Sequence, residues 1–244
     1  MNAIEDTPAA RGWAEIAARF PRPRAIVVVS AHWTTNGVRV MANARPQTIH
    51  DFGRGFPPDL FAVEYPAPGD PALAQQVVSL LAPFGAQLDE SWGLDHGAWS
   101  VLVHMYPNAD IPVLQVSLSA QSTPAERAEI GRALAPLRDD NVLILASGNI
   151  VHNLRSFFVN HDKGAPPQDA SFEAFIVDAV ERNDVSAVAA YASRPDAAIA
   201  APDWDHFTPL LYAMGASDGD RPYLFNRTFE PGIAMTAIAY GLPQ

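Results

Sequence analysis

The 244-residue sequence contains no cysteine. This absence excludes disulfide bonds, cysteine-ligated zinc, iron–sulfur clusters and thiol nucleophiles. Any transition-metal site in this chain must therefore be built from histidine and carboxylate ligands, and the sequence offers seven histidines for that purpose.

Positive charge is also scarce. The chain has 16 Lys and Arg against 27 Asp and Glu, which gives a formal net charge of −11. A net anion of this size repels a phosphate backbone, so we expect no nucleic-acid partner. The hydrophobic content of 48% and charged content of 18% are typical of a soluble globular protein.

Long apolar runs are missing as well. No stretch approaches the roughly 20 apolar residues that span a bilayer. The first residues lack the basic and hydrophobic regions of a secretory signal. We therefore expect no membrane partner and a cytoplasmic location.

Short apolar runs alternate with amphipathic segments along the chain. The patterns predict strands at residues 25–30, 38–42, 111–117, 142–146, 222–229 and 233–240. They predict helices at residues 9–20, 71–84, 98–106, 123–137, 170–182, 185–192 and 206–215, with Thr123 and Glu126 forming a capping box. No repeat or linker divides the chain. We expect one α/β domain over residues 1–244, a sandwich whose central mixed, mostly buried sheet is flanked by helices.

Histidine follows two of the predicted buried strands. His32 lies in Ser30-Ala31-His32-Trp33, and His152 lies in the segment SGNIVHN, in which Gly148 permits a sharp backbone turn or a close approach to a ligand. Sites in open α/β sheets lie just beyond the carboxyl ends of strands, and imidazole is a good ligand for iron and zinc. Two histidines in equivalent positions favour metal binding or acid–base work over two unrelated polar strand ends.

His206 lies near the start of an apolar helix in the segment DWDHFTPLLY. Its local pattern alone favours capping or packing. Asp205 is available as a helix cap, and Asp203 or Asp205 is available as a hydrogen-bonding partner of a ligand histidine.

His96 lies between glycines in the segment GLDHGAW. It either exchanges a proton with a substrate oxygen or simply follows Asp95, a helix N-cap. His50 lies in a loop rich in glycine and aromatic residues, which either lines a pocket for a flat ligand or is an ordinary turn. We expect His104 and His161 to have no functional role. Phosphate-loop, nucleophile-elbow and HExxH motifs are absent, which leaves metal chemistry as the strongest theme.

Six segments in this order, SAHW, TIHDFGRGFP, YPAPG, GLDHGAW, SGNIVHN and HFTPLLY, together resemble the DOPA-dioxygenase-type branch of the class III (LigB-like) extradiol ring-cleavage dioxygenases. The resemblance covers nearly the whole chain, and the joint match is specific although each segment alone is weak. It implies a single α/β domain with one non-haem Fe(II), or Zn²⁺ in some members. It also implies that the protein cleaves a catechol next to one hydroxyl and inserts both atoms of O₂.

The resemblance also assigns roles to residues. It implies metal binding by His32, His152 and His206. It places His96 and Asp95 beside the substrate, and it leaves His152 either a ligand or an acid/base. The expected site residues are, for catalysis, His152, His96 and Asp95, and for substrate binding, His50, Phe52 and Asn149. Arg54 or Arg155 would suit a carboxylated ring.

One departure from the family pattern is large. The family begins with a strand followed by Gly-His-Gly-Ser-Pro-Met, whose histidine is a metal ligand, and this sequence has no such segment. We therefore expect the chain to lack the family's first strand and one edge of the metal site. Two alternatives to a dioxygenase follow: a zinc-dependent hydrolase that uses the same histidines, and a catalytically impaired binding protein. The expected partners are a small catechol and O₂, and the expected state is a monomer or small homo-oligomer.

Overall fold

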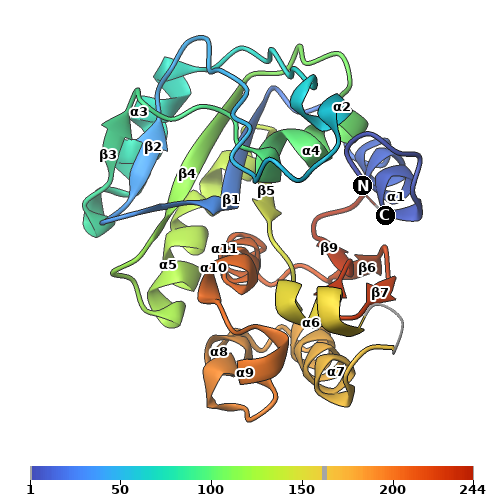
Figure 1. Ribbon diagram of the computed structural model, residues 1–244. Coiled ribbons are helices and arrows are strands. Elements are labelled where there is room, and N and C mark those ends of the chain that lie inside the picture. Colours follow the sequence, from blue (N-terminus) through green and yellow to red (C-terminus); the bar gives the residue numbers. More distant parts are fainter. Residues whose placement is uncertain (1, 161–163, 244) are drawn as a thin grey trace.

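The computed structural model describes residues 2–160 and 164–243. Its centre is a five-stranded sheet in the order β3-β2-β4-β1-β5 (Figure 1). The strands are β1 (Ala25–Thr35), β2 (Arg39–Met41), β3 (Gln87–Asp89), β4 (Val113–Ser119) and β5 (Val142–Ser147). Strand β1 runs parallel to both β4 and β5, whereas β2 is antiparallel to β4. The predicted mixed sheet within an α/β fold is confirmed.

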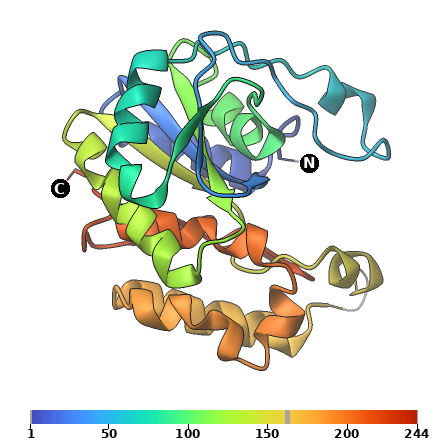
Figure 2. The same cartoon turned by 90° about the vertical axis from the view of Figure 1, so that its left-hand side faces the viewer.

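Helices cover both faces of the sheet. The α-helices are α1 (Pro8–Ala17), α2 (Pro58–Phe61), α3 (Pro71–Leu80), α4 (His96–Met105), α5 (Pro124–Leu134), α6 (Leu154–Asn160), α7 (Pro167–Glu181), α8 (Val185–Ala189), α9 (Ala197–Ala200), α10 (Trp204–Phe207) and α11 (Pro209–Ala216). Three 3-10 turns are η1 (Ala82–Phe84), η2 (Ala135–Arg138) and η3 (Tyr191–Ser193). Helices α3 and α5 lie in front of the sheet in Figure 2, and α1 and α4 lie behind it. In the described part of the chain, no helix is both long and apolar enough to cross a membrane.

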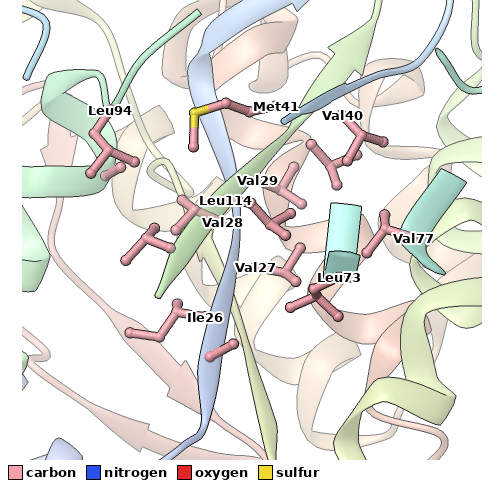
Figure 3. Close-up of a cluster of buried hydrophobic side chains, with 14 of the residues drawn as sticks. Ile26, Val27, Val28, Val29, Val40, Met41, Leu73, Val77, Leu94 and Leu114 are labelled. Carbon is pink, nitrogen blue, oxygen red and sulfur yellow. The ribbon is translucent and has the colours of Figure 1, made fainter. Parts of the chain in front are cut away.

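The main core forms around β1. Residues Ile26 to Val29 are completely buried and pack against β4 and the apolar side of α3 (Figure 3). Such a continuous β-branched run is typical of a strand covered on both faces. A second apolar cluster joins α7, α8 and α11 below the sheet in Figure 1. The candidate functional residues described below lie where the carboxyl ends of β1 and β5 meet this lower layer.

Several local predictions are confirmed and others are corrected. The capping box of Thr123 and Glu126 starts α5 as predicted. The helix expected at 206–215 is instead two helices, because Pro209 has no backbone N–H and begins a new helix, α11, after α10. The strands expected at 222–229 and 233–240 are four short strands, β6 (Tyr223–Phe225), β7 (Phe229–Glu230), β8 (Ile233–Ala234) and β9 (Ala237–Ala239). Helices α2, α6 and α9 and strand β3 were not predicted.

Strand β5 is the edge of the sheet, and no strand among the described residues pairs with its second side. A cavity of about 400 Å³ runs along that side. Residues 142–150 form one wall of the cavity, and α1 and β9 contribute to the others. At the carboxyl end of β5 the cavity reaches His206. The apolar sequence of β5 is thus only partly covered, unlike the fully buried β4.

Candidate metal centre and active site

Four histidine rings form a continuous row. The ring centroids of His96 and His32 are 3.8 Å apart, and those of His32 and His206 are 4.9 Å apart. His206 and His152 stack in parallel with 3.6 Å between their centroids. The structure thus brings together the three histidines predicted as metal ligands and adds His96 at one end. The four residues come from β1, α4, α10 and the segment after β5.

His32 lies within β1, which continues past its predicted end at residue 30. The pairing of β1 with β4 changes register between Val29 and Thr34. Such an irregularity redirects side chains locally, and here it lies beside the site. Gly97 allows α4 to approach this part of β1. A Cβ at that position would lie 2.3 Å from Ser30 Oγ and 2.9 Å from His32 Cδ2.

His206 and His152 are held by main-chain contacts. Asn149 N–H donates to His206 O at 2.8 Å, and His152 N–H donates to Ala200 O at 2.9 Å. A Cβ on Gly148 would lie 2.2 Å from His206 O, so only glycine permits this approach. The sequence predicts a sharp turn or a close approach to a ligand at Gly148, whereas the close approach observed is to another segment of the chain. The Asn149 side chain donates to Ala234 O at 2.9 Å.

Two carboxylates contact the histidine row from its sides. Asp205 Oδ1 lies 3.0 Å from His206 Nδ1. This contact corresponds to one of the two roles considered for Asp205, that of a hydrogen-bonding partner of the histidine. Asp51 Oδ1 lies 2.9 Å from His96 Nδ1, and Asp51 Oδ2 lies 3.5 Å from His32 Nδ1. Sequence reasoning missed Asp51. The available signal was its place in the segment TIHDFG, which already contains two expected substrate-binding residues.

Asp95 is completely buried, and both of its carboxylate oxygens are hydrogen-bonded. Oδ1 accepts from Ser30 Oγ at 2.7 Å and from Ala98 N–H at 3.1 Å. Oδ2 accepts from Trp92 Nε1 at 3.2 Å and from Gln115 Nε2 at 3.1 Å. Asp95 is the N-cap of α4, as predicted, and His96 is the first residue of that helix.

Aromatic side chains flank the row beside His96. The Phe52 ring lies 5.3 Å from the His96 ring and also contacts Phe56, Phe61 and Trp99. The ring of His50 belongs to the same cluster, and His50 Nε2 lies 3.0 Å from Val63 O. Phe52 and His50 thus lie on the side of the row where a flat ligand would meet aromatic faces.

His104 lies away from the row. Its Nε2 lies 2.6 Å from Asn2 O, and its ring is 6.1 Å from that of Trp13. His161 lies outside the described residues.

Burial keeps the imidazoles of His32 and His152 neutral. Burial first, and then the neighbouring His96 and His206, lower the pKa of His32 from 6.5 to about 3. Burial and His206 lower the pKa of His152 from 6.5 to about 4. Burial raises the pKa of Asp51, but its contacts with His96 and His32 outweigh burial and leave that pKa below the usual value. At neutral pH the site therefore presents the neutral imidazoles of His32 and His152 beside the ionised carboxylates of Asp51 and Asp205.

This donor set fits a divalent transition metal. Metal binding requires deprotonated ligands, and the lowered pKa values of His32 and His152 meet that requirement. One nitrogen from each of His32 and His96 and one oxygen of Asp51 lie within 4.8 Å of one another, so this group has the spacing of a metal site and shares only His32 with the predicted ligands. Imidazole and carboxylate together suit iron or zinc. The fold and the donor set define a metal-dependent enzyme of the α/β class.

Comparison with known proteins gives the family. Residues 5–243 match the family described as the catalytic LigB subunit of aromatic ring-opening dioxygenase, and the chain belongs to this family. The chain is 45% identical over 229 residues to a 4,5-DOPA dioxygenase extradiol of Escherichia coli K12, with 91% of this chain and 83% of the relative covered. It is 38% identical to the enzyme of the same description from Beta vulgaris, with 90% and 82% covered.

A solved structure agrees with this assignment. The crystal structure of an uncharacterized protein from Escherichia coli K12 superposes with a TM-score of 0.84 at 39% identity, covering 98% of this chain and 94% of the other. The predicted class, a non-haem extradiol ring-cleavage dioxygenase, is confirmed.

Replacing Asp95 by asparagine should destabilise the fold. Each oxygen of the Asp95 carboxylate accepts two hydrogen bonds. The NH₂ group of an amide would replace one of these oxygens and face two donors that it cannot accept from. Unsatisfied buried polar groups of this kind cost about 2–3 kcal/mol. The matched control is Asp70→Asn, because Asp70 caps α3 through Leu73 N–H at a partly exposed position, where asparagine caps about equally well. Urea unfolding measures both variants, and equal stability losses would contradict the proposed importance of the buried network.

The metal-free protein should lose stability as the pH falls from about 6.5 toward 4. In that window His32 and His152 bind protons in the unfolded chain but stay unprotonated in the folded protein. Each of them therefore lowers the free energy of unfolding by about 1.4 kcal/mol for every pH unit of acidification. This stability is fully present above pH 6.5. Urea midpoints measured with a chelator present should fall less steeply for His152→Asn than for the wild type. Identical slopes would contradict the neutral state of His152.

Proposed function

We propose that this protein cleaves a catechol with a DOPA-like side chain. Both oxygen atoms of O₂ enter the product, one on each carbon of the ring bond that breaks beside a hydroxyl. The proposal rests on the row of four imidazoles, flanked by Asp51 and Asp205, at the carboxyl ends of β1 and β5. The substrate class is suggested by relatives described as 4,5-DOPA dioxygenase extradiol.

The proposed metal is Fe(II), with Zn²⁺ as the alternative, and His32, His152 and His206 would hold it. When bound, iron would lower the pKa of the catechol hydroxyls and bring the catecholate and O₂ together. Asp205 supports this assignment because it contacts His206 Nδ1 and thereby favours Nε2 as the metal-binding atom.

His96 is the proposed proton-transfer residue. Its ring lies against that of His32 and beside Phe52, between the proposed metal position and the aromatic cluster. A catechol that binds there would place its hydroxyl groups next to the imidazole of His96. The imidazole could then accept a hydroxyl proton as a general base. Phe52 and His50 would contact the flat ring, and Asn149 would line the opposite end of the row near His206.

We assign Asp95 a positioning role in this reaction. Its carboxylate is fully buried and bonded to four donors, so a substrate has no access to it. Because Asp95 caps α4, it fixes the first residue of that helix, His96. Its effect on catalysis would therefore pass through the position of the imidazole.

The groove beside β5 would accommodate a further parallel strand. The unpaired side of β5, its apolar sequence and the cavity of about 400 Å³ support a single extended segment at this position. The first strand of the family pattern, which is followed by Gly-His-Gly-Ser-Pro-Met, is an extended segment of this kind. The cavity reaches His206, so such a segment would end near the histidine row. A single domain, a cytoplasmic location and a monomer or small homo-oligomer complete the proposal.

The activity is tested by oxygen uptake. We expect anaerobically loaded Fe(II) protein to consume O₂ and form a yellow ring-opened product from L-DOPA or a simpler catechol. The 244-residue chain is compared with a chain extended upstream by a strand and the Gly-His-Gly-Ser-Pro-Met segment, which should bind metal more tightly. Zinc-loaded and chelator-treated samples are the controls. No turnover of several catechols by the extended, iron-loaded protein would refute the proposal, and O₂-independent ester cleavage by the zinc form would favour the hydrolase.

His152→Ala separates the two roles open to this residue. If His152 is a ligand, the variant should lose bound metal together with activity, as His206→Ala should. If His152 is an acid/base, the metal content should stay at the wild-type level while kcat falls about 10²-fold or more. Metal analysis by mass spectrometry and single-substrate kinetics give both readouts. A variant with wild-type metal content and wild-type kcat would exclude both roles.

A further inference from the structure

Asp51 contacts two of the four imidazoles at once. Its Oδ1 accepts the main-chain N–H of His96 at 2.9 Å and lies at the same distance from the Nδ1 atom of that residue. Its Oδ2 lies 3.5 Å from His32 Nδ1. The side chain of Asp51 is 17% exposed, so the carboxylate is largely shielded from water. No other carboxylate described above lies between two rings of the row.

The chain before Asp51 is firmly anchored. Ile49 N–H donates to Leu94 O at 2.7 Å, and Leu94 N–H donates to Gln47 O at 2.8 Å. Trp99 Nε1 donates to Ile49 O at 2.9 Å. Residues 47–49 are therefore fastened to the segment that leads into α4 and to α4 itself. Asp51 follows only two residues later, so its carboxylate has a defined position relative to His96.

The negative charge of Asp51, close to both Nδ1 atoms, favours one ring nitrogen as the proton carrier, although His96 Nδ1 forms no aligned hydrogen bond. An ionised carboxylate only accepts hydrogen bonds, so a neutral imidazole that faces it with Nδ1 is stabilised with the proton on Nδ1. Nε2 of the same ring then keeps its lone pair. Because Asp51 faces Nδ1 of both His32 and His96, it leaves both Nε2 atoms as bases.

We propose that Asp51 is a positioning residue that fixes the Nδ1–H tautomers of His32 and His96 together. This inference rests on the proposed function, because it prepares His32 Nε2 to bind the metal and His96 Nε2 to accept the substrate proton. A single carboxylate thereby sets the spacing between the metal-binding ring and the proton-transfer ring. Asp205 performs only half of this task, since it contacts His206 alone.

Asparagine at position 51 should affect the two histidines differently. The amide oxygen would stay with His96, where Oδ1 now accepts the main-chain N–H and lies beside Nδ1, and the amide NH₂ would face His32 Nδ1. His32 would then shift to the Nε2–H tautomer, which has no lone pair at Nε2 for a metal. Alanine at position 51 would release both rings.

The first test uses the metal-free protein and no substrate. Long-range proton–nitrogen NMR spectra distinguish the two tautomers, and His32→Asn and His96→Asn variants assign the signals. We expect Nδ1–H on both residues in the wild type. Asp51→Asn should convert His32 to Nε2–H and leave His96 unchanged, whereas Asp205→Asn should affect His206 only. Nε2–H signals for both His32 and His96 in the wild type would overturn the proposal whatever the activity.

The second test separates metal binding from catalysis. Chelator competition should show metal binding about tenfold weaker for Asp51→Asn. Asp51→Ala should also lower kcat about tenfold or more at saturating metal, with little change in KM for the catechol. Asp59→Ala, at an exposed position on α2, is the matched control and should leave both quantities unchanged. Complete loss of metal from Asp51→Asn, equal to that of His32→Ala, would make Asp51 a ligand and overturn the positioning role. If His32 and His96 carry Nδ1–H but the protein turns over no catechol, the proposed function is refuted and the role of Asp51 in setting the tautomers stands.

Discussion

The buried carboxylate of Asp95 is the contact on which the geometry of the site depends. It joins Ser30 of β1, Gln115 of β4, Trp92 of the preceding loop and the first turn of α4. Ser30 Oγ in turn accepts the main-chain N–H of His32 at 3.2 Å. The strand that carries His32 and the helix that begins with His96 therefore share one anchor. Burial raises the pKa of Asp95, and a carboxyl group with no access to water is stable only when its oxygens are hydrogen-bonded, so the four donors must all remain in place. This requirement makes the distance between the two histidines insensitive to movements of the surface.

Local rules explain how much of the structure could be predicted. The apolar run Ala25–Ser30, the capping box of α5 and the cap of α4 depend on neighbouring residues, and their predictions are confirmed. Predictions failed where the determining contact lies far along the chain. Strand β1 continues to Thr35 because β4 pairs with it there, and nothing in the local pattern of the segment SAHW shows this.

The same distinction applies to the site. The histidines near the carboxyl ends of β1 and β5 could be predicted, because parallel strands bring these ends together. His206 looked like a packing residue on its local pattern, and only the resemblance made it a ligand. Its position depends on Gly148, on Asn149 and on the guanidinium of Arg127, which lies 3.9 Å above the ring of Trp204. Asp51 could not be singled out, because a loop sequence does not reveal which of three consecutive side chains faces inward.

The row of imidazoles would be unstable if its members were charged. Adjacent rings lie 3.6 to 4.9 Å apart, and protonating one of them would disfavour protonation of its neighbours. Burial and mutual repulsion keep His32 and His152 neutral, while Asp51 and Asp205 supply the negative charge that a divalent cation would meet. The arrangement thus favours a metal ion over protons as the source of positive charge. A chain without cysteine has few other ways to build such a centre, and this one concentrates four of its seven histidines in it.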